Sequence, residues 1–281
     1  MPSTYAHLRL GREVLERLDG EPRRVCGEHE NLFLIGLHGP DILFYYDALH
    51  RNPVSSVGFG MHDRPGRELF ERAKASFPET RDAGRAYAYG FACHFALDSE
   101  AHPYIEDYIH SHGVAHTAIE GEFDRMLLER DGIEPRRAYL AGHISADGDD
   151  CAVISRFFPG VTPEQVSKAL EDMRHYNRLL VAPRRLKRWL IERTLRRSGN
   201  YDDMIGLVLR NEPDPPLHGE RQGAGPHLRW GGRPVGGAHR RSREVLRRLR
   251  GASPEVRPDV LLHVTDRTRP TLMVATGRSL M

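Results

Sequence analysis

The stretch from Phe91 to Glu120 constrains the fold more than any other part of the sequence. Residues that can bind a metal recur in it at intervals of four: His94, Asp98 and His102, then His116 and Glu120. Residues four apart share one face of a helix. The spacing therefore predicts two neighbouring helices, each with imidazole and carboxylate groups side by side.

Pairs of this kind also occur as surface ion pairs, which are worth only about 0.2–0.5 kcal/mol each. Here the first pair is set among apolar residues, which predicts a largely buried helix: Phe91, Cys93, Phe95, Ala96 and Leu97. Polar side chains on a buried helix need partners. We therefore interpret the cluster as a metal site between adjacent helices, with Cys93 as a buried thiol outside it.

A further carboxylate, Asp41, follows the Gly39-Pro40 turn inside the apolar stretch NLFLIGLHGPDILFYY. A carboxylate in such surroundings is costly unless it is paired or bound to a metal. The segment RNPVSSVGFGMHDRPG, which contains His62, is rich in Pro and Gly and is predicted to be an irregular loop.

Two other polar residues near these motifs have open roles. His38 is predicted either to orient a metal-binding carboxylate or to hydrogen-bond with backbone. Asp124, one turn after Glu120, is predicted to form a salt bridge with Arg125 or Arg64 rather than to bind metal.

Helical periodicity dominates the chain up to residue 211, and strand patterns are scarce, so we predict an all-α fold. Helices are expected over these ranges: Thr4–Leu18, Arg64–Phe77, Asp82–Ser99, Val114–Asp131, a helix starting at Thr162, and a helix from Pro183 to Gly199.

Composition changes after residue 211. Residues 212–240 contain 7 Gly and 5 Pro, and residues 212–281 contain 13 Arg and no Lys. Such composition is typical of loops or disordered chain. We predict a helical domain at 1–211 and a poorly ordered or weakly docked tail at 212–281, with contact to RNA or a membrane surface as the alternative role of the tail.

Hydrophobic residues make up 39% and charged residues 28% of the chain, as in soluble globular proteins. There is no apolar run of the length that a transmembrane helix needs. The N-terminal stretch lacks the apolar core of a signal peptide, and the three Cys are scattered, which favours a reducing compartment. We therefore expect a cytoplasmic protein.

Five motifs resemble the zinc-dependent phospholipase C family, whose wider superfamily includes the S1/P1 nucleases: STYAHLRLG, GLHGPDILFYY, MHDRP, GFACHFALDSEAHPYIEDYI and GVAHTAIEGEFDRML. The similarity runs from residue 3 to about residue 211. It implies an all-helical bundle around a multinuclear site of two or three zinc ions.

The resemblance also implies which residues bind each ion. For the first zinc these are Asp41, His62, His94 and Asp98; for the second they are His102, His116 and Glu120. Asp98 would bridge to a third zinc completed by His7 and the N-terminus. The gap between Asp98 and His102 is shorter than in the family, and the chain begins with Met-Pro-Ser instead of the tryptophan of secreted members.

Imidazole and carboxylate ligands suit Zn²⁺, and manganese or iron would also accept them. Zinc lowers the pKa of a bound water to about 7, so a metal-activated water can attack phosphorus without a protein nucleophile. Asp41 is the candidate general base, or it is a ligand only. We predict a phospholipase C-like phosphodiester hydrolase, with a phospholipid or another phosphate ester as substrate.

Three alternatives remain at this point. The first is a nuclease- or nucleotidase-like hydrolase of nucleic acid or soluble phosphate esters, for which, as for a lipid substrate, four tyrosines are candidates to line the pocket: Tyr45, Tyr46, Tyr104 and Tyr108. The second is a non-catalytic bundle stabilised by metal. The third, an HD-type phosphohydrolase, is suggested only by the His62-Asp63 dipeptide.

Overall fold

The computed structural model describes residues 4–48, 50–113 and 116–198. Within these ranges all regular elements are helices, which confirms the predicted all-α class: α1 (Thr4–Arg17), α2 (Gly20–Glu28), α3 (Glu30–Gly36), η1 (Gly39–Tyr45), α4 (Pro53–His62), α5 (Gly66–His112), α6 (His116–Arg130), η2 (Pro135–Arg137), α7 (Gly148–Ser155), α8 (Pro163–Leu180) and α9 (Arg185–Ser198). The boundary predicted at residue 211 and the predicted tail at 212–281 lie outside the described ranges and stay predictions. None of the described helices is both long enough and apolar enough to cross a membrane.

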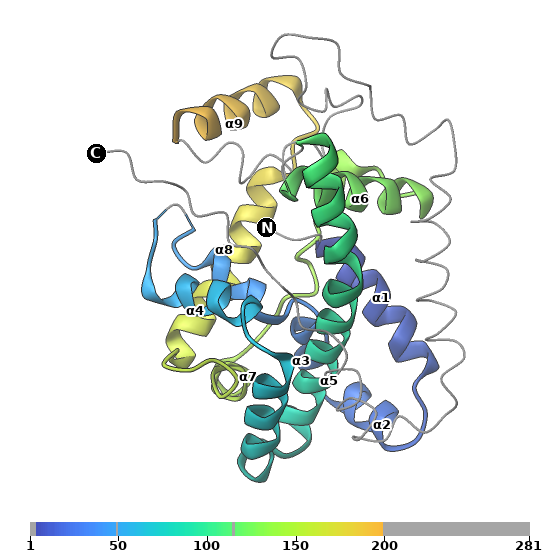
Figure 1. Ribbon diagram of the computed structural model, residues 1–281, viewed down its shortest axis with the longest axis vertical. Coiled ribbons are helices and arrows are strands. Elements are labelled where there is room, and N and C mark those ends of the chain that lie inside the picture. Colours follow the sequence, from blue (N-terminus) through green and yellow to red (C-terminus); the bar gives the residue numbers. More distant parts are fainter. Residues whose placement is uncertain (1–3, 49, 114–115, 199–281) are drawn as a thin grey trace.

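The central element is α5, which runs along the long axis of the molecule (Figure 1). It joins the two helices predicted at 64–77 and 82–99 across a kink at Arg81, whose φ of 51° and ψ of −134° are not helical. The predicted end at Ser99 is wrong, because the helix continues through Pro103 to His112. Proline costs a helix interior about 3 kcal/mol, so the sequence alone favours an earlier end.

Helices α3 and α5 cross at two glycines, Gly36 and Gly90. A Cβ atom added at Gly90 would lie 2.1 Å from the carbonyl oxygen of Phe33, and one at Gly36 would lie 2.4 Å from that of Tyr87. Only glycine allows the two backbones to approach this closely. The crossing fixes the part of α5 that lies one turn before His94.

The predicted irregular loop around His62 is instead largely helix α4. Asn52 caps this helix, since its side chain accepts a hydrogen bond from the backbone N–H of Ser55 at 2.8 Å, and Pro53 occupies the first turn. Both features are strong helix-start signals, and they outweigh the glycines that follow. The correction places His62 at the last residue of a rigid element.

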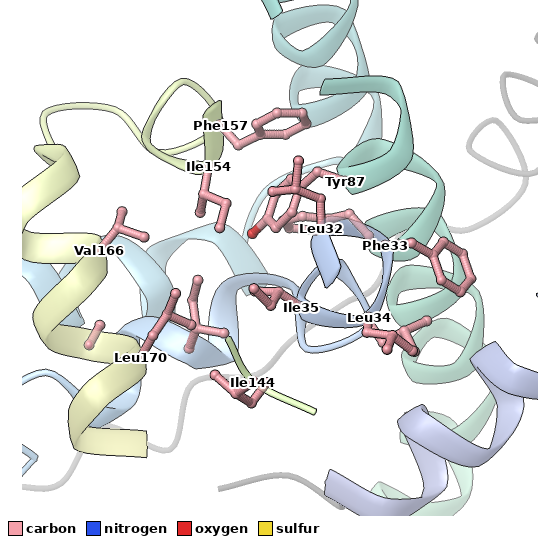
Figure 2. Close-up of a cluster of buried hydrophobic side chains, with 14 of the residues drawn as sticks. Leu32, Phe33, Leu34, Ile35, Tyr87, Ile144, Ile154, Phe157, Val166 and Leu170 are labelled. Atoms are coloured by element: carbon pink, nitrogen blue, oxygen red, sulfur yellow. The ribbon is translucent and has the colours of Figure 1, made fainter. Parts of the chain in front are cut away.

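Helix α3 lies in the hydrophobic core, and Figure 2 shows its Leu32 and Ile35 on the side of α7 and α8 and its Phe33 on the side of α5. The helix predicted to start at Thr162 is α8, which Thr162 and Gln165 begin with a capping box and which contributes Val166 and Leu170 to this core. A smaller cluster joins α1 to α6: Tyr5, Ala6, Leu127, Leu128, Ala138 and Leu140. The two clusters hold α1, α5 and α6 in the positions that create the site.

Candidate metal centre

Asp98, on α5, lies at the centre of a group of histidines from three helices. Four imidazole Nε2 atoms surround its carboxylate: His7 at 3.2 Å, His94 at 3.3 Å, His102 at 3.8 Å and His62 at 3.9 Å. His94 and His102 precede and follow Asp98 by one turn, as the sequence spacing predicts. His7 from α1 and His62 from α4 join them only through the tertiary fold.

Asp41 approaches the same group from the first turn of η1 and is almost fully buried, with 2% of its surface exposed. Its Oδ1 lies 3.1 Å from His62 Nε2. Neither carboxylate oxygen has a hydrogen-bond partner of good geometry among the described residues. Its one printed ion-pair partner is the imidazole of His62, and a buried carboxylate with so few donors is costly, so Asp41 suits a site that binds a cation.

Gly39 permits this approach. Its φ of 49° is in the left-handed region, and a Cβ atom at this position would lie 2.2 Å from Cδ2 of the His94 ring. Any side chain would therefore be strained and would also collide with the imidazole. The Gly39-Pro40 turn sets the distance between Asp41 and His94.

His62 presents Nε2 to the site because its other ring nitrogen is occupied. Nδ1 lies 3.0 Å from the carbonyl oxygen of Gly58, one turn earlier in α4. A histidine that donates Nδ1–H to a carbonyl has its Nε2 lone pair available for a metal.

A second group lies where α5 ends and α6 begins. His116 Nε2 lies 2.9 Å from Glu120 Oε1, and the ring of His102 lies 5.1 Å from that of His116, centroid to centroid. One potential ligand atom from each of the three residues lies within 4.8 Å of the other two. Because α5 continues through Pro103, His102 lies between Asp98 and His116 and connects the two groups.

For the histidines of the site, burial lowers the pKa, whereas the nearby carboxylates raise it. Burial lowers the pKa of His94 to about 4, against the effect of Asp98 and Asp41. Burial would also lower the pKa of His62, but Asp41 and Asp98 raise it to about 9. Partial burial would raise the pKa of Asp98, yet the imidazoles of His94 and His7 hold its pKa below the usual range.

Zinc fits this donor set. Ligands at about 2.0–2.1 Å from a tetrahedral zinc are roughly 3.3 Å apart, and the atoms around Asp98 and Asp41 are separated by 3.1–3.9 Å. Two further three-residue groups have ligand atoms within 4.8 Å of one another: His7, Asp41 and His94, and His62, His94 and Asp98. All eight predicted metal-binding residues thus lie in one connected cluster. Residues 1–3 are outside the described ranges, so the predicted role of the N-terminus is not addressed.

His38 differs from both interpretations made from the sequence. Its Nε2 lies 2.6 Å from Nε2 of His143, in the segment between η2 and α7, rather than against a carboxylate or backbone group. Burial lowers the pKa of His38 well below its usual range, and it lowers that of His143 to about 4. The pair is therefore neutral at pH 7, with one ring donating to the other.

Asp124 has a structural role that the sequence did not predict. Its two carboxylate oxygens accept hydrogen bonds from the backbone N–H groups of Tyr5 and Ala6, both at 2.9 Å. These groups lie in the first turn of α1, where backbone N–H groups have no intrahelical acceptor. The predicted salt bridge to Arg125 is wrong, because Arg125 instead bonds Glu122 and Glu129. Asp124 thereby holds the first turn of α1, directly before His7, against α6.

Replacing Asp124 with alanine should lower the free energy of unfolding by about 2–4 kcal/mol, because two buried N–H groups lose a charged acceptor. Urea unfolding measures this change. Glu129→Ala is the matched control: it removes an exposed carboxylate from the same helix and should cost under about 1 kcal/mol. Equal losses in the two variants would contradict this role.

Aromatic side chains lie beside His62, although they are not the tyrosines proposed from the sequence. Phe44 stacks on Phe59 with ring centroids 4.2 Å apart, and its ring lies 5.4 Å from that of His62. Phe59 is 59% exposed. Tyr45 instead belongs to the buried core, because consecutive side chains of a 3-10 helix such as η1 point about 120° apart.

The family model described as zinc-dependent phospholipase C matches residues 6–169, which include all eight clustered residues. No curated protein and no solved structure matches the chain.

Proposed function

The chain belongs to the zinc-dependent phospholipase C family, and on this premise we propose that it is a zinc-dependent hydrolase that cleaves the glycerol–phosphate ester of a phospholipid. The observation that carries the proposal is the Asp41 carboxylate, which is buried, faces three imidazoles and has no hydrogen-bond donor of good geometry among the described residues. Such a carboxylate suits a cation-binding site far better than a hydrophobic core.

We propose that the eight clustered residues hold two or three zinc ions. Asp41, His62, His94 and Asp98 would hold one ion, with His7 beside Asp98, and the group of His102, His116 and Glu120 would hold another. When bound, zinc supplies Lewis-acid chemistry and a hydroxide nucleophile at neutral pH.

The residues of the chain contribute orientation and proton transfer. Gly58 holds the imidazole of His62, and Gly39 lets Asp41 approach His94. Asp41 has two carboxylate oxygens, so one can bind while the other accepts the proton of the attacking water. Because a zinc ligand must be a neutral imidazole, ion binding near pH 7 should displace the proton that His62 holds with a pKa of about 9.

A soluble phosphodiester such as an oligonucleotide is the second candidate substrate. The observation that favours it is the Phe44–Phe59 stack, which has an exposed ring close to His62. Aromatic faces bind nucleobases by stacking and are tolerant of sequence.

The experiment is a substrate panel assayed with the zinc-loaded full chain: phosphatidylcholine, single-stranded DNA, a 3′-nucleotide and bis-p-nitrophenyl phosphate. We expect release of phosphocholine from phosphatidylcholine, loss of turnover after chelation and recovery with zinc. Preferential turnover of DNA or the 3′-nucleotide would support the second candidate. Absence of turnover on every substrate, or less than one zinc per chain by elemental analysis, would reject the proposal.

A further inference from the structure

Helix α9 lies outside the residues that match the family and is amphipathic, but its apolar face is exposed. Leu186, Trp189 and Leu190 are 69%, 52% and 49% exposed. None of the α9 side chains whose exposure is described is buried. In α8, by contrast, the apolar face is buried in the core, through Val166, Leu170 and Met173 among others. The exposed apolar face of α9 therefore indicates an interaction site whose partner is not among the described residues.

The apolar residues form one stripe. Positions 186, 189, 190 and 193 share a helix face, and the guanidinium of Arg193 lies 5.1 Å above the ring of Trp189. Lys187, at the border of the stripe, donates a hydrogen bond to the carbonyl oxygen of Val181 at 2.6 Å, which fixes the start of α9 against the preceding segment.

The charge of α9 indicates the chemistry of the partner. Its sequence contains six Arg or Lys residues and one Glu, whereas the whole chain has a net charge of only +2. Arg185 borders the apolar stripe and Arg193 continues its face by one turn, and both are exposed. Helices that lie in a membrane interface combine these features: a basic polar face, and Trp and Leu on the other face. Trp has a particular preference for the headgroup region.

We propose that α9 docks the protein on the surface of an anionic phospholipid bilayer, with Leu186, Trp189 and Leu190 entering the interface and Arg185 and Arg193 binding lipid phosphates. Along the long axis of the molecule, α9 lies at the end where α5 gives way to α6 (Figure 1), and His116 of the second group is the first residue of α6. The inference extends the proposed function, since a bilayer would present the phospholipid substrate near the candidate site.

The test is co-sedimentation of the full chain with vesicles of phosphatidylcholine alone or of an equal mixture with phosphatidylglycerol. We expect binding to the anionic vesicles that weakens with added salt. The variant Leu186→Gln/Trp189→Gln/Leu190→Gln should reduce the partition coefficient at least about tenfold. Arg185→Gln/Arg193→Gln should abolish the preference for anionic vesicles. Ile133→Gln, an exposed apolar residue after α6, is the control and should bind like the parent.

A second readout does not depend on variants that might perturb folding. In the Trp230→Phe background Trp189 is the remaining tryptophan, and its emission should shift to the blue when anionic vesicles are added. Emission that is already blue-shifted without vesicles would mean that another part of the chain or a second copy covers the stripe, and would overturn the proposal. Equal binding by the triple variant and the parent would also overturn it.

Hydrolysis of bis-p-nitrophenyl phosphate separates this inference from the proposed function. The α9 variants should retain turnover of this soluble ester while losing turnover of anionic vesicles. Vesicle binding without hydrolysis of any ester would support docking and reject the proposed activity. Hydrolysis of the soluble ester without vesicle binding would support the proposed activity and reject docking.

Discussion

Asp98→Asn is expected to remove at least one zinc per chain and to reduce turnover of phosphatidylcholine at least about 100-fold. The amide keeps the shape of the carboxylate but loses its charge, and four imidazole Nε2 atoms lie within 3.2–3.9 Å of that group. Elemental analysis of the purified variant gives the zinc content, and phosphocholine release gives the rate.

His110→Ala is the control for this variant. His110 lies on the same helix but is exposed, with Nδ1 2.9 Å from the carbonyl oxygen of Glu106. It should keep both zinc and activity. If Asp98→Asn retained the zinc content and the rate of the parent, Asp98 would not be part of the metal centre.

Gly90→Ala should destabilise the fold by about 3 kcal/mol or more and should also lower zinc content. The new Cβ would lie 2.1 Å from the carbonyl oxygen of Phe33, which is backbone and cannot rotate away, so α3 and α5 must separate. His94 follows Gly90 by one turn and would move away from Asp41. Urea unfolding and elemental analysis measure the two effects.

Gly27→Ala is the matched control, because a Cβ at this exposed position in α2 meets nothing within 4 Å. Alanine is the better helix former, so this variant should be more stable than the parent by about 0.5–1 kcal/mol. A similar decrease in the free energy of unfolding in both glycine variants would show that stability does not depend on the close crossing of α3 and α5.

Local signals predicted much of the helical structure because they depend on neighbours in the sequence. The helix predicted to start at Thr162 and the one predicted from Thr4 are examples. The errors occurred where local signals conflict. Pro103 suggested a helix end, and the glycines around His62 suggested a loop, but α5 continues and Asn52 caps α4. The predicted cytoplasmic location stays a prediction.

The sequence by itself determined the all-α class and the pairs that share a helix face: His94 with Asp98, and His116 with Glu120. Their spacing is a property of the helix and needs no tertiary information. The placement of His7 and His62 near Asp98 was predicted only from the resemblance to the family; the tertiary structure brings them together, and it joins Asp124 to the first turn of α1, which was not predicted. These contacts join residues far apart in the chain, and they depend on how the helices pack: the two glycines allow the close α3–α5 crossing, and a separate apolar cluster packs α1 on α6.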